Sequence, residues 1–185
     1  MQSNNNSRLT TIFLIVFIDL LGFGLILPLL PYIAENYNAN PLVIGLLSAS
    51  YSLFQFLAGP ILGRLSDRYG RKKILIISQI GSVMGYLLLA TANSLPLLFL
   101  SRIIDGITGG NISIAQAYMA DITDKKTRAK GMGLLGAAFG LGFMLGPATG
   151  GYLSRFGFAI PALVAAIIGT ITTLMTVFFL KETVN

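Results

Sequence analysis

Three ionisable residues lie inside long apolar stretches of this 185-residue chain: Asp19, Arg102 and Asp105. A charge at the middle of a membrane-spanning helix costs about 2.5–3.5 kcal/mol on insertion scales. Residues placed there at such a cost mark ion or proton pathways, or form pairs that fix helix packing. A carboxylate beside a cavity that is wetted from one side and then the other can bind a proton and release it.

Asp19 is the main candidate for proton binding. The chain contains no histidine or cysteine, so a carboxylate is the group best suited to exchange protons, and zinc or haem lacks its usual ligands. We therefore expect no metal and no cofactor. Asp19 lies about nine residues into its apolar stretch, roughly 14 Å along a helix. The alternative is a structural Asp19, hydrogen-bonded to the backbone or to a neighbouring helix.

Arg102 and Asp105 are three residues apart, so they can pair on one helix face. The same face continues to Ser113 and Gln116, about three turns further along. A polar stripe has no reason to face lipid, so we expect it to line a cavity or a helix contact. A buried structural pair is the alternative. Further polar candidates near the middle of the membrane are Asn111, Gln55 and Tyr51.

Six apolar stretches position these residues. The chain is 54% hydrophobic and 11% charged, too apolar for a soluble domain of this length. Each stretch supplies the roughly 20 helical residues that cross a bilayer. The sequence predicts an all-α integral membrane protein, a single bundle of six transmembrane helices with no soluble domain. The predicted helices span residues 10–32, 42–62, 74–93, 96–120, 131–153 and 159–180.

Basic residues gather in the connections on one side of this bundle. Every lysine and arginine except Arg102 and Arg155 lies before the first helix, after the second or fourth, or after the sixth. The positive-inside rule then places both termini in the cytoplasm. The net charge of +6 might suggest nucleic acid, but no soluble domain presents these residues. We expect the lipid bilayer as partner and no nucleic acid.

The connection at residues 63–73 reads Gly-Arg-Leu-Ser-Asp-Arg-Tyr-Gly-Arg-Lys-Lys. Its two glycines permit a tight turn, and Asp67 is expected to accept backbone N–H groups at a helix N-terminus. Arg71 can pair with Asp121 at the end of the fourth helix and so latch the cytoplasmic side. The alternative is a solvated loop with a purely topological role. The predicted cytoplasmic gate comprises Gly63, Asp67, Arg68, Gly70, Arg71, Lys72 and Asp121.

The fifth stretch is rich in glycine. Gly142, Gly146 and Gly150 follow one another at intervals of four residues, which lets another helix approach closely. Pro147 removes a backbone donor and is expected to bend the helix. These features indicate either close packing alone or a seam along which parts of the bundle slide. The predicted seam comprises Gly140, Gly142, Gly146, Pro147, Gly150 and Gly151.

The second and fifth stretches share an internal repeat. Both open with Gly-Leu-Leu-x-Ala, at residues 45–49 and 133–137. Both close with Gly-Pro-x-x-Gly, at residues 59–63 and 146–150. The two helices run in opposite directions through the membrane. The sequence therefore predicts two inverted three-helix repeats, as in many secondary transporters. Chance recurrence of short apolar strings is the alternative.

Several of these motifs resemble those of the major facilitator superfamily. The 63–73 connection is similar to the family signature Gly-x-Leu-Ser/Ala-Asp-Arg-x-Gly-Arg-Arg/Lys. Residues 100–106 resemble the helix-four motif, whose arginine, here Arg102, is implicated in proton coupling. Residues 142–151 resemble the helix-five motif of drug/proton antiporters.

Two further segments resemble one branch of these exporters. Asp19, followed nine residues later by Pro28, is similar to their helix-one motif. Residues 19–28 and 117–124 look most like the tetracycline/proton antiporter branch. The resemblance extends over essentially the whole chain.

The resemblance implies one half, the N-terminal one, of a major facilitator fold. The implied activity is proton-coupled export of small amphipathic compounds or drugs by alternating access, with no enzymatic reaction. Asp19 would titrate, and Arg102 and Asp105 would tune it. The implied location is a bacterial inner (plasma) membrane.

Two features depart from the family pattern. Tetracycline exporters have an aspartate within helix three, where this chain has Gly85. The family also has twelve helices, whereas this chain has six. Either the chain is an N-terminal fragment whose partner is a C-terminal six-helix half, or a second copy of this chain takes that place. A half-size membrane module that inserts without transporting is the remaining interpretation.

Overall fold

The computed structural model describes the backbone of residues 2–184 and the side chains of residues 8–184. Within this range the chain is helical and contains no strand. The all-α prediction is therefore confirmed for the described residues. In chain order the elements are α1 (Gln2–Ile26), α2 (Leu30–Glu35), α3 (Pro41–Tyr69), α4 (Arg71–Thr91), α5 (Leu95–Thr108), α6 (Asn111–Ile122), α7 (Arg128–Leu153), the 3₁₀ turn η1 (Ser154–Phe156) and α8 (Ala159–Phe179).

Six segments of the described chain are long and apolar enough to cross a membrane. Four of them are centred on the single helices α3, α4, α7 and α8. The other two each combine a pair of helices, α1 with α2 and α5 with α6. The break between α1 and α2 contains Pro28, and that between α5 and α6 contains Gly109 and Gly110. The helix predicted over residues 96–120 is therefore interrupted near its middle.

The 63–73 connection is far more helical than predicted. Helix α3 continues to Tyr69 and α4 starts at Arg71, so Gly70 alone separates them. Its φ of 109° lies in a region that residues with a Cβ rarely adopt. Gly63 lies inside α3, and no described atom outside its own stretch of helix lies within 4 Å of a Cβ placed on it. Only one of the two glycines therefore makes the turn.

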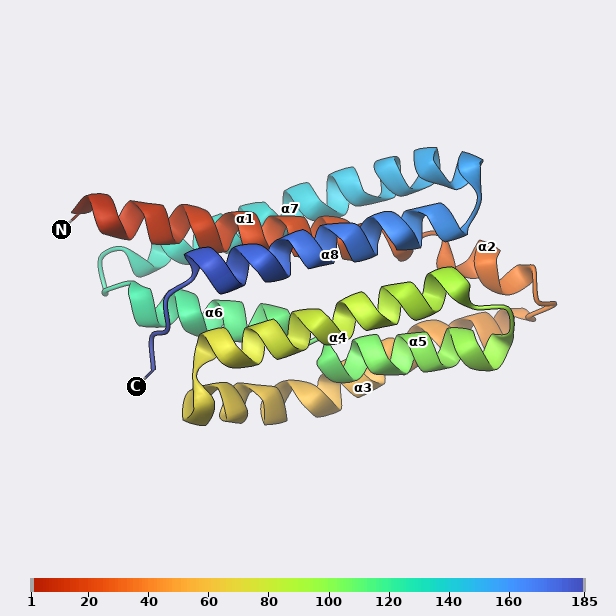
Figure 1. Cartoon of the computed structure of the whole chain (residues 1–185), viewed down its shortest axis with the longest axis horizontal. Coiled ribbons are helices and arrows are strands. Elements are labelled where there is room, and N and C mark those ends of the chain that lie inside the picture. The colour runs from red at the N-terminus through yellow and green to blue at the C-terminus, as the bar shows by residue number, and fades with distance from the viewer. Residues whose placement is uncertain (1, 185) are drawn as a thin grey trace.

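Most of the helices pack into two groups, one above the other in Figure 1: α1, α7 and α8 above, and α3, α4 and α5 below. In the upper group α1 packs against α7 and α8, and in the lower group α5 packs against α3 and α4. Contacts between α4 and α8 join the two groups, and α6 touches helices of both. The contacts have an internal symmetry: they are preserved when each of the first three spans is exchanged with its counterpart among the last three. Exchange turns the α1–α7 contact into α5–α3 and the α1–α8 contact into α5–α4, as an inverted repeat requires.

Both ends of the described chain lie at the same end of the bundle (Figure 1). The α3–α4 junction and the α6–α7 connection, which contain most of the basic residues, lie there too. The opposite end contains α2, the α4–α5 turn and η1. The charge asymmetry of the sequence is thus an asymmetry of the folded molecule.

Glycines let α1 and α7 approach closely. A Cβ added to Gly146 would lie 2.6 Å from the Cα of Gly24, and one added to Gly142 would lie 2.7 Å from the Cβ of Leu20. Gly150 faces α1 in the same way, at Leu25, and Pro147 lies beside Gly24. Two residues of the predicted seam do not belong to this contact. No described atom lies within 4 Å of a Cβ placed on Gly140 or Gly151.

Candidate functional site

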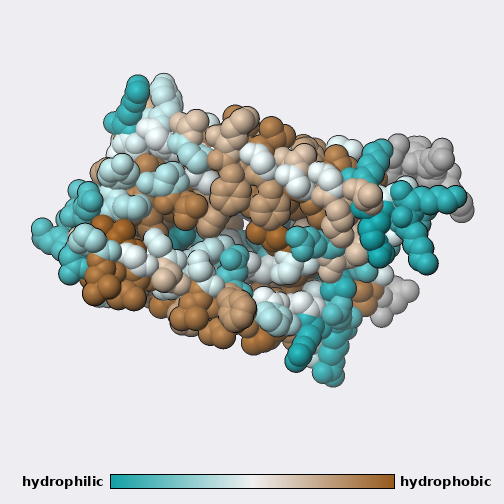
Figure 2. All heavy atoms as spheres, turned by 180° about the vertical axis from the view of Figure 1, so that it is seen from behind, coloured by the Kyte–Doolittle hydropathy of each residue, from teal (hydrophilic) through white to brown (hydrophobic). Residues whose placement is uncertain are grey.

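A cavity of about 270 Å³ lies between the two groups of helices. Figure 2 shows the face opposite to that of Figure 1, hollowed near its middle between apolar flanks. The lining combines aromatic rings with polar side chains, so the cavity can hold an amphipathic molecule. The aromatic residues are Phe23, Tyr51, Tyr86, Phe139 and Phe143, and the polar ones are Asp19, Gln55, Gln79, Ser82, Asp105 and Asn111.

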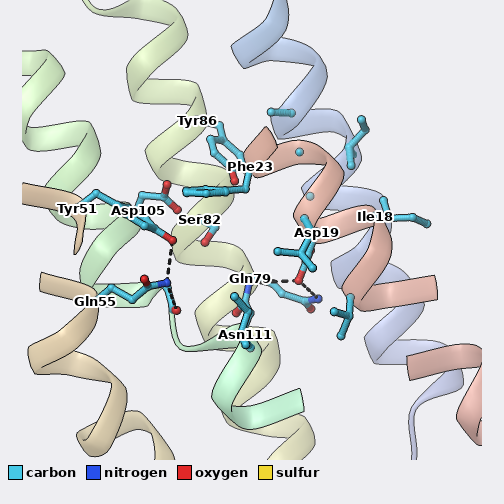
Figure 3. A pocket seen from close by; sticks show the side chains of 18 of the residues that line it. Ile18, Asp19, Phe23, Tyr51, Gln55, Gln79, Ser82, Tyr86, Asp105 and Asn111 are labelled. Atoms are coloured by element: carbon cyan, nitrogen blue, oxygen red, sulfur yellow. Dashed lines mark hydrogen bonds between the residues drawn. The ribbon is translucent and has the colours of Figure 1, made fainter. Parts of the chain in front are cut away.

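Asp19 accepts three hydrogen bonds from three other helices. Thr172 of α8 donates its hydroxyl to Oδ1 at 2.7 Å. The amide nitrogens of Gln79 in α4 and Asn111 in α6 both donate to Oδ2, each at 3.2 Å (Figure 3). The Asp19 carboxylate thus lines the cavity, and it is also hydrogen-bonded to three neighbouring helices.

Asp105 is the second carboxylate of the cavity. Arg102 Nη1 lies 3.2 Å from its Oδ2, and both side chains are 3% exposed. The sequence therefore predicted the pairing correctly, although Arg102 does not itself line the cavity. Two carboxylates are too few for the usual metal sites, and no group of three His, Cys, Asp or Glu in the described chain could hold a metal ion.

Gly85 lies directly against Asp105. A Cβ added to Gly85 would be 2.9 Å from the Cβ of Asp105 and 3.2 Å from the carbonyl oxygen of Ser101. Helices α4 and α5 thus touch at this level with no room for a side chain. An aspartate at position 85 would have to push the two helices apart or displace Asp105.

Side chains of α3 and α4 compensate the break between α5 and α6. Gln55 donates its amide to the carbonyl oxygen of Gly109 at 2.9 Å and to the hydroxyl of Tyr51 at 2.8 Å (Figure 3). Ser78 donates its hydroxyl to the carbonyl of Thr108. Backbone groups freed within a membrane must find such partners. Interrupted helices that line a cavity are typical of substrate and ion sites in transporters.

The break also changes which residues of this span face the cavity. Asn111 lines it, but Ser113 and Gln116 are exposed and do not. The prediction of a continuous polar stripe from Arg102 to Gln116 assumed one unbroken helix, which the structure does not have; that Ser113 and Gln116 line a cavity or a helix contact stays a prediction. The adjacent glycines at 109 and 110 were the available sequence signal for a break.

Several cavity residues were not predicted from the sequence. Gln79 offered a signal, as an amide within an apolar helix, whereas the aromatic rings were indistinguishable from lipid-facing ones. Thr172 is fully buried and is one of four threonines in α8. The residues that sequence analysis missed are Phe23, Gln79, Ser82, Tyr86, Phe139, Phe143 and Thr172.

A polar network lies at the end of the bundle that holds the basic residues. Arg71 Nε is 3.1 Å from Asp121 Oδ2, the pair expected from the sequence. Arg71 also pairs with Asp67 one turn earlier and donates to the hydroxyl of Ser66 at 2.7 Å. This arginine therefore ties the α3–α4 junction to the end of α6. Thr183, beyond α8, donates to the same Asp121 oxygen at 3.0 Å.

The acceptor at the start of α4 is Glu182, not Asp67 as predicted. Its Oε1 accepts the backbone N–H of Lys72 at 3.2 Å, and its carboxylate lies against Gly70. Asp67 lies two residues before the end of α3, and its carboxylate pairs with Arg71 instead. The side chain of Lys72 donates to the carbonyl of Val177 at 2.7 Å. Arg68 instead packs over the ring of Tyr69.

Comparison with known proteins gives a consistent result. The family model described as Major Facilitator Superfamily matches residues 12–185. The class H tetracycline resistance protein of Pasteurella multocida is 40% identical over 183 residues, which cover 96% of this chain and 45% of that protein. The class B tetracycline resistance protein of Escherichia coli is 38% identical over 183 residues, which cover 97% of this chain and 46% of that protein. Multidrug resistance protein 2 of Bacillus subtilis (strain 168) is 35% identical over 180 residues, which cover 95% of this chain and 45% of that protein.

Solved structures agree with these relatives. The human organic anion transporter MFSD10 (TETRAN) superimposes with a TM-score of 0.89 at 31% identity, covering 98% of this chain and 49% of that one. A peptide transporter, POT, superimposes with a TM-score of 0.83 at 19% identity, which shows the fold alone. The chain spans just under half the length of the curated relatives named above.

Proposed function

The chain belongs to the major facilitator superfamily, and on this premise we propose that it is the N-terminal half of a proton-coupled exporter of small amphipathic compounds. One observation supports this above all. A membrane-embedded carboxylate and five aromatic rings face the same cavity. An amphipathic compound can pack on the rings while the carboxylate exchanges a proton with the solvent that enters.

Asp19 is the proposed proton site. In alternating access, the cavity opens first to one side of the membrane and then to the other. Asp19 would take a proton from outside while the cavity faces outward and release it to the cytoplasm while the cavity faces inward. Arg102 and Asp105 would act on Asp19 through their charge, from the opposite group of helices.

The network around Arg71 is the proposed cytoplasmic gate. Arg71 and Asp121 join α4 of one repeat to α6 of the other through a contact of 3.1 Å. We propose that this pair is intact when the inner side is closed and separates when it opens. The end of the bundle that contains this pair would face the cytoplasm, and both termini would lie on that side. The membrane would be a bacterial plasma membrane.

The proposed partner is a C-terminal six-helix half. The chain matches just under half of its relatives, and the apolar spans centred on α3 and α7 are only 11% and 28% buried. These two helices lie on the outside of their groups, where a second half can cover them. A second copy of this chain is the other candidate, since the two halves of such transporters are related by an axis along the membrane normal. The mass of the purified protein in detergent distinguishes one copy from two.

The Asp19→Asn variant of the complete protein tests the function. Membrane vesicles bearing an imposed pH gradient are loaded with a fluorescent amphipathic dye, and its transport is followed. The variant should insert in normal amount but lose gradient-driven transport. Asp124→Asn, which removes an exposed carboxylate from the α6–α7 connection, is the matched control and should transport normally. Undiminished transport by Asp19→Asn would refute the proposed role.

A further inference from the structure

We infer that Gln79, Asn111 and Thr172 are positioning residues that satisfy the hydrogen-bonding needs of Asp19 in both its charged and its protonated state. This inference rests on the proposed role of Asp19 as the proton site. It explains how a carboxyl group between packed helices can change its charge and still keep hydrogen-bond partners of its own, whose loss would be costly.

The observed geometry suits the charged carboxylate. All three neighbours present a donor to Asp19, through two amide nitrogens and one hydroxyl. The Thr172 hydroxyl donates to Oδ1 at 2.7 Å, a normal length for an O–H···O hydrogen bond. The donors come from α4, α6 and α8, so three helices meet at one carboxylate.

Each neighbour also has an unused alternative. The Thr172 oxygen lies 2.9 Å from the carbonyl oxygen of Gly169, and its single proton can serve only one acceptor at a time. Within the described chain, Gln79 Oε1 and Asn111 Oδ1 are buried and have no hydrogen-bond partner. Gln79 is only 1% exposed, so solvent cannot easily satisfy its free oxygen.

Protonation makes use of these alternatives. A proton that arrives from solvent in the cavity binds one carboxylate oxygen, which then needs an acceptor. A half-turn of the Gln79 or Asn111 amide about its last bond exchanges nitrogen and oxygen, so that the idle carbonyl oxygen accepts the new O–H. Thr172 can turn its hydroxyl to Gly169 at the same time. Release of the proton to solvent reverses each step, and no other reactant is consumed.

Few other ionisable groups face Asp19. Asp105 of α5, Tyr86 of α4 and Tyr51 of α3 line the same cavity, and Arg102 pairs with Asp105. Helix α8 contains no ionisable residue, and those of α7 lie near its two ends. Those of α6, Tyr118 and Asp121, lie toward the basic end of the bundle. The polar groups that contact Asp19 directly are therefore the uncharged side chains of Gln79, Asn111 and Thr172.

Infrared spectroscopy of the purified protein in lipid tests the inference without requiring transport. The carbonyl band of a protonated carboxyl group is followed as pH is varied, and the part lost in Asp19→Asn is assigned to Asp19. Thr172→Val should move the midpoint of this band to higher pH by about one unit, a tenfold change, because the charged form loses a donor. Thr172→Ser keeps the hydroxyl and should restore the original midpoint. Thr173→Val is the matched control, since Thr173 also bonds Gly169 but is not among the residues that donate to Asp19.

Gln79→Leu tests the acceptor role. It should move the carbonyl band of protonated Asp19 to higher frequency, because the Asp19 O–H loses its acceptor. A Gln79 with only a packing role would leave this frequency unchanged. If an Asp19 band is present but Thr172→Val and Gln79→Leu behave like Thr173→Val, the inference is overturned while the proposed function stands. If no band is sensitive to Asp19→Asn at any pH, Asp19 does not exchange protons, and both proposals are wrong.

Discussion

The α1–α7 contact predicts opposite outcomes for the same substitution at two glycines of α7. A Cβ added to Gly146 would lie 2.6 Å from the Cα and 2.7 Å from the carbonyl carbon of Gly24, so backbone would meet backbone. No described atom lies within 4 Å of a Cβ added to Gly140. Gly146→Ala should therefore separate the two helices, and Gly140→Ala should leave them in place.

The size of the effect follows from these distances. Carbon atoms in contact prefer about 3.5–4.0 Å, so α1 and α7 must move apart by about 1 Å to accept the new methyl group. Overpacking of this kind costs about 1–3 kcal/mol. Both variants share the gain in helix propensity that alanine brings over glycine, about 0.8–1.0 kcal/mol. Gly146→Ala should therefore be less stable than Gly140→Ala by about 1–3 kcal/mol.

Unfolding in mixed detergent micelles measures this difference. The chain contains no tryptophan, so helix content by far-ultraviolet circular dichroism is the suitable signal. The midpoint of the Gly146→Ala variant should fall below that of the wild type, and that of Gly140→Ala should not. Equal midpoints for the two variants would show that α1 and α7 do not approach as closely as described.

Three further predictions concern other parts of the molecule. Replacing Glu182 by Gln should lower the thermal midpoint slightly, since a charge at the start of α4 contributes about 0.3–1 kcal/mol; an unchanged midpoint would argue against this cap. Because the chain has no cysteine, single cysteines at Lys125 and Asn38 can be labelled without background, and an impermeant reagent should reach them from opposite sides of the membrane. Gln55→Leu leaves the Gly109 carbonyl without its donor and should destabilise the bundle by about 1–3 kcal/mol in the same micelle assay.

The sequence was sufficient for features that depend on spacing within one helix. Arg102 and Asp105 are close because three residues make nearly one helical turn. The glycines at 142, 146 and 150 share a face for the same reason, and they do meet α1. The apolar stretches and the basic connections gave the six spans and the end of the bundle at which the charges gather.

Apart from the Arg71–Asp121 pair, the contacts between helices could not be predicted in the same way. Thr172 and Gln79 reach Asp19 only because α8 and α4 are rotated to present them, and a single sequence does not reveal that rotation. Glu182 lies beyond the last apolar stretch, where no pattern indicates that the chain folds back on Gly70. The choice of Asp67 as the acceptor at α4 failed because it assumed a loop where the helix continues to Tyr69.

The break between α5 and α6 was missed for a related reason. Apolar residues surround Gly109 and Gly110, so the stretch has the hydropathy of one continuous span. The break depends on Gln55 and Ser78, which take the freed carbonyls from other helices. Of the polar residues that follow the break, Asn111 lines the cavity, and Ser113 and Gln116 do not.

We propose that a compound that enters the cavity displaces the proton from Asp19. The most direct test is to add a lipophilic cation, tetraphenylphosphonium, to the purified complete protein in weakly buffered detergent and to record the protons released. Wild type should release protons as the cation binds, and Asp19→Asn should release none. Equal release from both proteins, or binding without any release, would contradict the claim.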